Sequence, residues 1–415
     1  MNKTNSFYFR RFARLMAAFP LAMAATVAVT SPVVGQTAEA FRIGLVTDMS
    51  SAYSDLSGKG SVAAVQMAIE DFGGIMLGRK IELVTADHQM KPSVGSAIVT
   101  EWFDRDNVSV VVGLAGSSVA LAGQAIVKDR PKKLIIQTVG QTSELIGKSC
   151  LPNSIHWTPD FYALAVSATR YVAQTGGKSW YVMVQDTAAG TPARAAAQAG
   201  IQSGGGKIVG DVRVPANADD VSFYVLQAQG SAAENVAVGF GGADMVNIMK
   251  SGDTFGLRQS GVVFTSLSFF TSDVVAMGLP LAQGITFATS FYPTMSEEAK
   301  VWSQRFKERT GRLPDFTHAG EYEAVTHYLK TVQKLGSDDA TVVVPAMKAG
   351  LIDTFASKGG LIRADNQFVR PMHLARVKSP SKSTGPDDFF EIIGTIGPDD
   401  AFSPLIDSAC PMVKK

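Results

Sequence analysis

The side chains best suited to chemistry in this 415-residue chain are its five histidines, His88, His156, His318, His327 and His373. His318 and His327 fall on one predicted helix nine residues apart, so they point to opposite faces and cannot share a metal ion. Glu323 precedes His327 by four positions, a spacing more typical of a surface contact than of an acid/base pair. The sequence has no HExxH, paired-cysteine or GxSxG motif. We therefore expect no enzyme activity, no metal and no cofactor.

Three loops rich in hydroxyl groups offer a different chemistry, that of binding. Their sequences are DMSSAYSD at 48–55, GLAGSSVA at 113–120 and QTVGQTSEL at 137–145. Each follows a predicted strand, and open parallel sheets bind ligands beyond the carboxyl ends of their strands. Gly116, Ser117 and Ser118 open a predicted helix, whose free amides and dipole favour a carboxylate; the two serines would equally serve as helix caps. No GxGxxG follows a strand, so no dinucleotide site is predicted.

The elements that position these loops alternate along the chain. Apolar runs predict strands, and amphipathic segments between them predict helices. The predicted strands of the first half are 41–47, 80–87, 108–113 and 133–137. Those of the second half, which restarts after Cys150, are 179–185, 206–214, 236–240, 261–266 and 284–288, with a further strand at 372–377. This alternation predicts an α/β fold of two doubly wound, Rossmann-like halves with parallel sheets.

Two longer helices are predicted in the last third of the chain, over 297–310 and 318–335. The second carries one apolar stripe, formed by Tyr322, Val325, Leu329 and Val332.

The first forty residues predict export. Lys3, Arg10, Arg11 and Arg14 precede the apolar run LMAAFPLAMAATVAV, and Ala38-Glu39-Ala40 closes the segment. This is the pattern of a cleavable signal peptide over 1–40, ordinary or twin-arginine, which places the mature protein in the periplasm. Apolar residues make up 46% and charged residues 18% of the chain, and the formal net charge is +1. These values exclude disorder and disfavour nucleic-acid binding.

The two cysteines, Cys150 and Cys410, are predicted to form a disulfide in this oxidising compartment. Neither belongs to a CxxC motif or has a histidine at ligand spacing, which disfavours a catalytic thiol or a metal site. Chain-entropy models assign so long a loop on the order of 5 kcal/mol of stabilisation. The bond would tie the C-terminal tail to the segment that leaves the first half.

Taken in order, these pieces resemble a known family. The stretches that carry the resemblance are GLVTDMSSAYSDLSG, ADHQMKP, CLPNSIHWT, GGKSWYVMVQD, the GGAD-to-FGL stretch, SFYPT, AGEYEAVTHYLK and AFSPLIDSACPMVK. The chain resembles the type I periplasmic solute-binding proteins of ABC importers, in the leucine/isoleucine/valine-binding (extracellular ligand-binding receptor) family, over essentially all of 41–410. In that family two lobes joined by three hinge strands close around a ligand.

The resemblance implies how this chain divides. Lobe I would comprise 41–158 plus 290–368, and lobe II 159–289 plus 369–405. The tail, 406–415, would return to lobe I, as the predicted disulfide requires.

The resemblance also implies ligand contacts, carried over position by position. In lobe I, Ser117, Ser118, Gly140, Gln141 and Thr142 match the segment that holds a ligand carboxylate, and Tyr53 would line the same wall. In lobe II the matching positions are Asp186, Ala189, Phe240, Asp244 and Ser266. Trp157 falls at a hinge crossing, where it would stack on a ligand or fill a joint.

The departures from the family pattern bear on the ligand. Amino-acid binders place an acidic residue at the end of the lobe II strand, where this chain has Ser266 to Ser268. A buried ammonium without a partner costs several kcal/mol, unless Asp186 or Asp244 reaches it. The aromatic residue usual before Gly190 is here Ala189. We therefore expect the ligand to be a carboxylate without an amino group, in preference to a branched-chain amino acid. The cleft residues Tyr53, Trp157 and Phe240 favour an aromatic one.

The resemblance implies a mostly monomeric periplasmic receptor that delivers a small-molecule ligand to the membrane permease subunits of an ABC importer. Two alternatives remain open at this point. One is a ligand sensor for a signalling system. The other is a secreted serine hydrolase using Ser117 or Ser118, for which no base is found.

Overall fold

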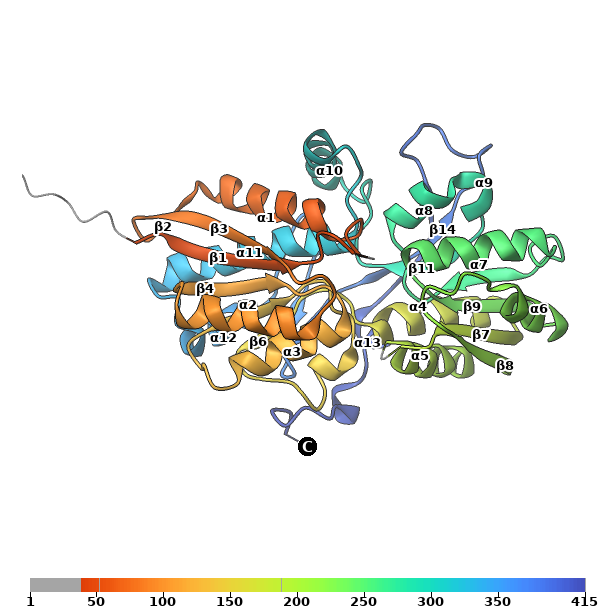
Figure 1. Cartoon of the computed structure of the whole chain (residues 1–415), viewed down its shortest axis with the longest axis horizontal. Helices are drawn as coiled ribbons and strands as arrows, with labels where there is room; N and C mark the ends of the chain where they lie inside the picture. Colours follow the sequence, from red (N-terminus) through yellow and green to blue (C-terminus); the bar gives the residue numbers. More distant parts are fainter. Residues whose placement is uncertain (1–38, 52, 188, 415) are drawn as a thin grey trace, which may run out of the picture. The chain divides into compact units, whose positions relative to one another are not determined.

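Two large β-sheets, each covered by helices on both faces, organise the protein (Figure 1). The structure is a computed structural model that describes residues 39–51, 53–187 and 189–414. The described residues belong to one compact unit that begins at Glu39. The predicted signal peptide lies outside the described residues except for Glu39 and Ala40.

The first sheet has the strand order β2-β3-β1-β4-β5-β6. Its strands are β1 (Phe41–Thr47), β2 (Ile75–Met76), β3 (Arg79–Asp87), β4 (Val108–Gly113), β5 (Leu134–Gln137) and β6 (Ser154–His156). All neighbours pair in parallel except the short β2, which is antiparallel to β3.

The second sheet has the order β15-β14-β11-β10-β9-β7-β8. Its strands are β7 (Ser179–Gln185), β8 (Lys207–Val214), β9 (Asn235–Gly239), β10 (Val263–Ser266), β11 (Thr286–Thr289), β14 (Met372–Val377) and β15 (Phe390–Ile396). The five strands β7 to β11 are parallel, as predicted, whereas β14 and β15 add an antiparallel edge. A two-stranded ribbon, β12 (Leu361–Ile362) with β13 (Phe368–Val369), precedes β14.

Helices cover both faces of each sheet. On the first sheet they are α1 (Gly58–Phe72), α2 (Pro92–Asp104), α3 (Ser117–Val127), α11 (Phe316–Leu335) and α12 (Ala340–Met347). On the second they are α4 (Phe161–Gln174), α5 (Gly190–Ser203), α6 (Ser222–Gly230), α7 (Gly242–Thr254), α8 (Thr271–Met277) and α9 (Leu279–Ala282). The remaining helices are α10 (Glu297–Thr310), α13 (Pro398–Ala401) and the 3-10 turns Ser143–Leu145 and Leu405–Asp407.

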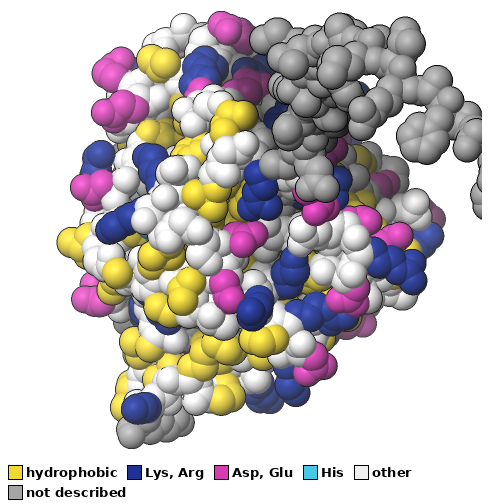
Figure 2. Space-filling model, turned by 90° about the vertical axis from the view of Figure 1, so that its left-hand side faces the viewer, with side chains coloured by type: hydrophobic (Ala, Val, Ile, Leu, Met, Phe, Trp, Pro, Cys, Tyr) yellow, Lys and Arg dark blue, Asp and Glu magenta, His cyan; other side chains and the backbone are white. Residues whose placement is uncertain are grey.

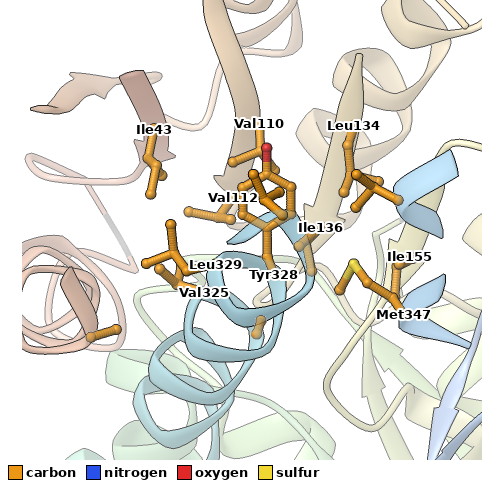
Figure 3. Packing of buried hydrophobic residues seen from close by; sticks show 14 of the residues in the cluster. Ile43, Val110, Val112, Leu134, Ile136, Ile155, Val325, Tyr328, Leu329 and Met347 are labelled. Carbon is orange, nitrogen blue, oxygen red and sulfur yellow. The ribbon is translucent and has the colours of Figure 1, made fainter. Parts of the chain in front are cut away.

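The predicted apolar stripe of 318–335 is confirmed in α11. Val325, Leu329 and Val332 are fully buried against the first sheet, and Tyr322 packs half-buried beside them. Figure 3 shows Val325 and Leu329 of this helix facing Ile43 and Val112 of the strands. Burial of such side chains contributes about 1.5–3 kcal/mol each, so this interface is a major source of stability for the first half.

The expectation that Glu323 makes a surface contact is wrong. Its side chain is buried and accepts a hydrogen bond at 2.7 Å from Nη1 of Arg370, which is itself 1% exposed. Thr354 donates to the other carboxylate oxygen. The spacing predicted correctly that Glu323 lies on the face shared with His327, but not that this face packs against the chain after β13.

The predicted disulfide between Cys150 and Cys410 is present, with 5.6 Å between the two Cα atoms. Cys150 lies just before β6, and Cys410 follows the last 3-10 turn. The bond therefore brings the C-terminal tail back to the first sheet.

The surface mixes charges of both signs. On the face that Figure 2 shows, Lys and Arg side chains are interspersed with Asp and Glu, among scattered apolar side chains. This fits the low net charge of +1. In the described ranges, no helix has the length and apolar character that crossing a membrane would need.

Replacing Glu321 with glutamine should stabilise the protein at neutral pH, and the gain should disappear in acid. Glu321 is fully buried on α11, and burial raises its carboxyl pKa from 4.5 to about 7. The native state thus keeps a proton that the unfolded chain releases, so the free energy of unfolding falls as pH rises from about 4.5 to about 7. Glutamine imitates the protonated acid and removes this slope.

Thermal unfolding of both proteins below and above this pH window provides the check. Glu308→Gln, at an exposed position on α10, is the matched control and should leave the pH profile unchanged. Parallel pH profiles of the wild type and Glu321→Gln would contradict the assignment.

Removing the disulfide with the pair Cys150→Ala and Cys410→Ala should lower the free energy of unfolding by about 2–5 kcal/mol, because the bond restricts the unfolded chain. Denaturant titration with and without a reducing agent measures this. The wild type under reducing conditions should match the double variant; a wild type insensitive to reductant and equal to the variant would show that the bond adds no stability.

Candidate functional site

The strand order reverses once within the parallel part of each sheet. In the first sheet the chain leaves β1 for β3 on one side and then returns to β4 on the other. In the second sheet β7 has β8 on one side and β9 on the other. Loops diverge at such points, which leaves a crevice beyond the carboxyl ends of the strands.

A cavity of about 240 Å³ is lined by loops from both crevices. The first sheet contributes residues that follow β1, β3, β4 and β5: Tyr53, Leu56, Met90, Gly116, Ser117, Ser118, Val139 and Gln141. The second half contributes Phe161, Gln185, Thr187, Ala189, Gly190, Ala193, Gly239, Phe240, Gly241, Ser268 and Phe270. A second cavity of about 760 Å³ shares Tyr53, Leu56, Gly241 and Phe270 with it and has a more polar lining.

Five residues of the predicted ligand set line the smaller cavity: Tyr53, Ser117, Ser118, Gln141 and Phe240. Ala189, also expected to face the cleft, lines it too. The structure thus brings together residues more than one hundred positions apart, from loops on both sheets.

Gly140 and Thr142 flank Gln141 but do not line the cavity. The carbonyl of Gly140 accepts a hydrogen bond at 2.7 Å from Nε2 of the buried His156. A carbonyl can only accept, so this imidazole carries its proton on Nε2, and burial lowers its pKa so that it stays neutral. Thr142 accepts from the amide of Glu144 at the start of a 3-10 turn. Both residues therefore hold the loop that presents Gln141.

Trp157 also lies away from the cavity. It is fully buried and stacks on Phe368 at 4.5 Å between ring centroids, and its indole Nε1 lies 3.5 Å from Glu323 Oε2. Of the two roles expected for it, the structure shows the joint-filling one.

The two acids and the serine predicted on the second half are engaged elsewhere. Asp186 is paired with Arg213 at 3.3 Å, and its side chain is 60% exposed. Asp244 accepts from Gln185 Nε2 at 2.5 Å and from the Asn217 amide at 3.1 Å. Ser266 donates to the Ser268 carbonyl at 2.9 Å. None of the three lines the cavity.

The carboxylate-binding feature predicted at Ser117 and Ser118 has the expected backbone. Helix α3 begins at Ser117 with Gly116 as its N-cap, so the serines occupy the first turn and not the cap position. The alternative in which they are caps is therefore wrong. Gly116 has φ 84°, a conformation that favours glycine, and a Cβ there would lie 2.5 Å from Met90 Cε. First-turn amides have no acceptor within the helix and are directed toward the cavity end.

The loop after β1 is organised by Asp48. This buried carboxylate accepts from the amides of Ser51 at 3.0 Å and Tyr53 at 2.8 Å. The phenol of Tyr53 is thereby fixed at the cavity wall, and burial raises its pKa, so it stays protonated. Asp48 is thus a supporting group for Tyr53.

Several lining residues were missed by sequence reasoning: Met90, Phe161, Gln185, Ser268 and Phe270. Gln185 is the last residue of the correctly predicted strand 179–185, so its place at the carboxyl end of the strand could have identified it as a cavity residue. Ser268 was considered only for its lack of charge. Phe161 begins α4, a helix that the sequence analysis did not predict.

The cavity lining carries no charged side chain among the described residues, and no histidine. Likewise, no group of three His, Cys, Asp or Glu residues in the described ranges could hold a metal ion. The arrangement supplies backbone amides, hydroxyls, amide side chains and aromatic rings. Such a set can bind a small polar and apolar solute.

Comparison with known proteins agrees with this arrangement. The model of a family described as periplasmic binding protein matches residues 40–385. A curated relative, Leu/Ile/Val-binding protein homolog 6 of Brucella melitensis biotype 1, is 22% identical over 321 residues, 75% of this chain and 80% of its own length.

Two solved structures are closer in sequence. A branched chain amino acid ABC transporter periplasmic ligand-binding protein from Burkholderia xenovorans is 39% identical, with a TM-score of 0.84 over 90% of this chain and 100% of that one. A periplasmic binding protein from Burkholderia mallei is 34% identical, with a TM-score of 0.86 over 91% and 100%. The chain therefore belongs to the periplasmic binding protein family, the two-lobed solute-binding proteins of ABC importers, which bind their solutes and are not enzymes.

Proposed function

We propose that this protein binds a small aromatic carboxylate without an amino group between its two sheets, and delivers it to the permease subunits of an ABC importer. The observation that carries the choice of ligand is the uncharged lining of the cavity in the described residues. An anion needs hydrogen-bond donors, which this lining has, whereas a cation needs a negative partner.

The carboxylate would lie at the first turn of α3. Backbone amides at a helix N-terminus and the helix dipole favour an anion. Ser117 and Ser118 supply hydroxyl donors at the same place, and the protonated phenol of Tyr53 lines the same wall. A counter-charge on the protein is therefore not required.

The remaining lining suits a ring. Phe161, Phe240 and Phe270 approach from the second half, and Met90 from the first. Aromatic rings pair in offset or edge-to-face geometry, and methionine sulfur makes favourable contacts with them. A planar apolar ring between these side chains would pack against the largest part of the cavity wall.

An α-amino acid fits less well. Its ammonium would be buried with neutral partners, because Asp186 is paired with Arg213 and Asp244 with Gln185 and Asn217. Burial of a charge without a counter-charge is strongly unfavourable. The relative from Burkholderia xenovorans carries a branched-chain name, so leucine is the rival ligand to test.

Known ligands of other proteins with this fold are consistent with the proposal. Solute-binding proteins from R. palustris, 19% and 17% identical to this chain, have been solved with 4-hydroxybenzoate and benzoate. At such identity the likeness concerns the fold, so the ligand must be argued from the lining.

We further propose the division into lobe I, 41–158 plus 290–368, and lobe II, 159–289 plus 369–405, with the tail 406–415 on lobe I. The membership of the two sheets supports it, since β1 to β6 and β7 to β11 fall in separate lobes. Export by the signal peptide, closure around the ligand and a monomeric state belong to the same proposal.

Aromatic carboxylates should raise the unfolding midpoint of ligand-stripped mature protein by a few degrees. A ligand present at about 100 times its dissociation constant adds about 2.7 kcal/mol to the free energy of unfolding. Thermal melting with benzoates, dicarboxylates and amino acids measures the shift. A shift with leucine and none with any aromatic acid would contradict the proposed ligand class.

Phe240→Ala should weaken binding of an aromatic acid by roughly tenfold or more, because a buried ring contact of about 1.5 kcal/mol or more is lost. Phe223→Ala is the matched control: this phenylalanine is on α6 of the same half, 64% exposed and outside the cavity lining. Titration calorimetry on both variants gives the comparison. Equal affinities of the two variants for the aromatic acid would show that the ring of the ligand does not pack against Phe240.

A further inference from the structure

Two glutamines line the cavity from opposite sheets. Gln141 lies on the loop after β5 of the first sheet, and Gln185 is the last residue of β7 in the second. A primary amide has a donor end and an acceptor end, so what each offers a ligand depends on which end a neighbour already occupies.

The orientation of Gln185 is set by Asp244. Nε2 of Gln185 donates to Oδ2 of Asp244 at 2.5 Å, and the same oxygen accepts from the Asn217 amide at 3.1 Å. An ionised carboxylate has no hydrogen to donate, so only the NH₂ end of the amide can face it. Oε1 of Gln185 is then the end that remains for a ligand, and it is an acceptor.

Gln141 is held in the opposite sense. Its Oε1 accepts from the hydroxyl of Ser268 at 3.0 Å, across from one half to the other. Its backbone carbonyl accepts from the amide of Phe161 at 2.8 Å. Ser268 is itself positioned by Ser266, which donates to its carbonyl.

Nε2 of Gln141 is buried, and no protein group in the described residues accepts from it. The residue as a whole is 6% exposed and lines the cavity. A buried donor without an acceptor is costly, and such groups in native structures generally have a partner. A ligand acceptor atom in the cavity would be that partner.

We propose that Gln141 and Gln185 determine the polarity of the ligand: it presents a hydrogen-bond acceptor to Gln141 Nε2 and a neutral hydroxyl or N–H donor to Gln185 Oε1. This rests on the proposed function and narrows it from aromatic carboxylates in general to those that carry a donor group on the ring. Asp244 and Ser268 act as positioning residues that fix the two amides. Asp244 does so without touching the ligand.

Asp244 thus has a role other than binding an ammonium group of the ligand. Its carboxylate does not line the cavity, and two donors already share one of its oxygens. Its effect on the ligand is transmitted through the direction of the Gln185 amide.

The test compares matched pairs of probes, 3- and 4-hydroxybenzoate against 3- and 4-methoxybenzoate, by titration calorimetry. Methylation keeps the oxygen as an acceptor but removes its hydrogen. In the wild type we expect at least one hydroxybenzoate to bind about tenfold more tightly than its methoxy counterpart, because two acceptors would otherwise oppose each other at Gln185.

Asp244→Ala is the decisive variant. Alanine offers Gln185 no acceptor, so the Gln185 amide is free to turn its NH₂ toward a methoxy oxygen. The preference for hydroxybenzoate should fall to about threefold or less, by weaker binding of the hydroxy and tighter binding of the methoxy probe. A purely structural defect would weaken both probes alike and leave their ratio unchanged.

Asp253→Ala provides the matched control, since Asp253 is exposed near the end of the same helix, α7, and outside this cavity. It should keep the wild-type ratio. Should Asp244→Ala fail to fold, Gln185→Met removes the amide itself and should abolish the preference.

The outcomes separate the two proposals. Equal binding of both members of each pair by the wild type, or an undiminished preference in Asp244→Ala, overturns the polarity inference and leaves the proposed function standing. Failure of the wild type to bind any of the four probes or benzoate overturns the proposed function, and the inference falls with it.

Discussion

The constraint on which the rest of this structure depends is that parallel strands deliver their loops at one edge. Two mainly parallel sheets, each with a reversal of strand order in its parallel part, place crevices beyond the ends of β1 and β4 and of β7 and β9. Because residues from both crevices line one cavity, a ligand there touches both halves at once. Among the described residues the cavity lining is therefore uncharged, and loop backbones and short polar side chains supply its hydrogen-bond donors.

The halves are joined by a buried polar cluster. Arg370 lies over the ring of Phe368 at 4.4 Å, Phe368 stacks on Trp157, and both Arg370 and Trp157 approach Glu323 of α11. The crossing that follows β6 and the crossing that precedes β14 thus share one carboxylate. A buried ion pair adds little net stability over apolar packing, but each partner makes the loss of the other expensive. This gives the crossings a defined geometry, which supports the matched positions of the two crevices.

Much of the fold could be predicted from the sequence, because the local residue pattern identifies strands and helices such as β7 and α11. Helix α4 was missed although its sequence carries signals for it: Asp160 caps its first turn, and residues 163–169 are small or apolar and all buried. Strand β6 has three residues and is too short for any pattern. For the site, position along the chain identified the right loops but not the direction of each side chain. Gln185 and Asp186 are adjacent, yet one lines the cavity and the other pairs with Arg213 at the surface. Backbone alternation, and not residue type, separates them.

The bond between Cys150 and Cys410 turns most of the chain into a covalent ring. Every strand of the second sheet lies inside this ring, whereas β1 to β5 lie outside it. A mechanical load applied to the two ends of residues 39–414 would run along the first sheet to Cys150, pass through the sulfur atoms to Cys410, and leave by the short tail. The second half would carry none of that tension. Similarly, a single backbone cut between these cysteines leaves the two fragments linked, so the protein remains one molecule after a nick in any loop of its second sheet.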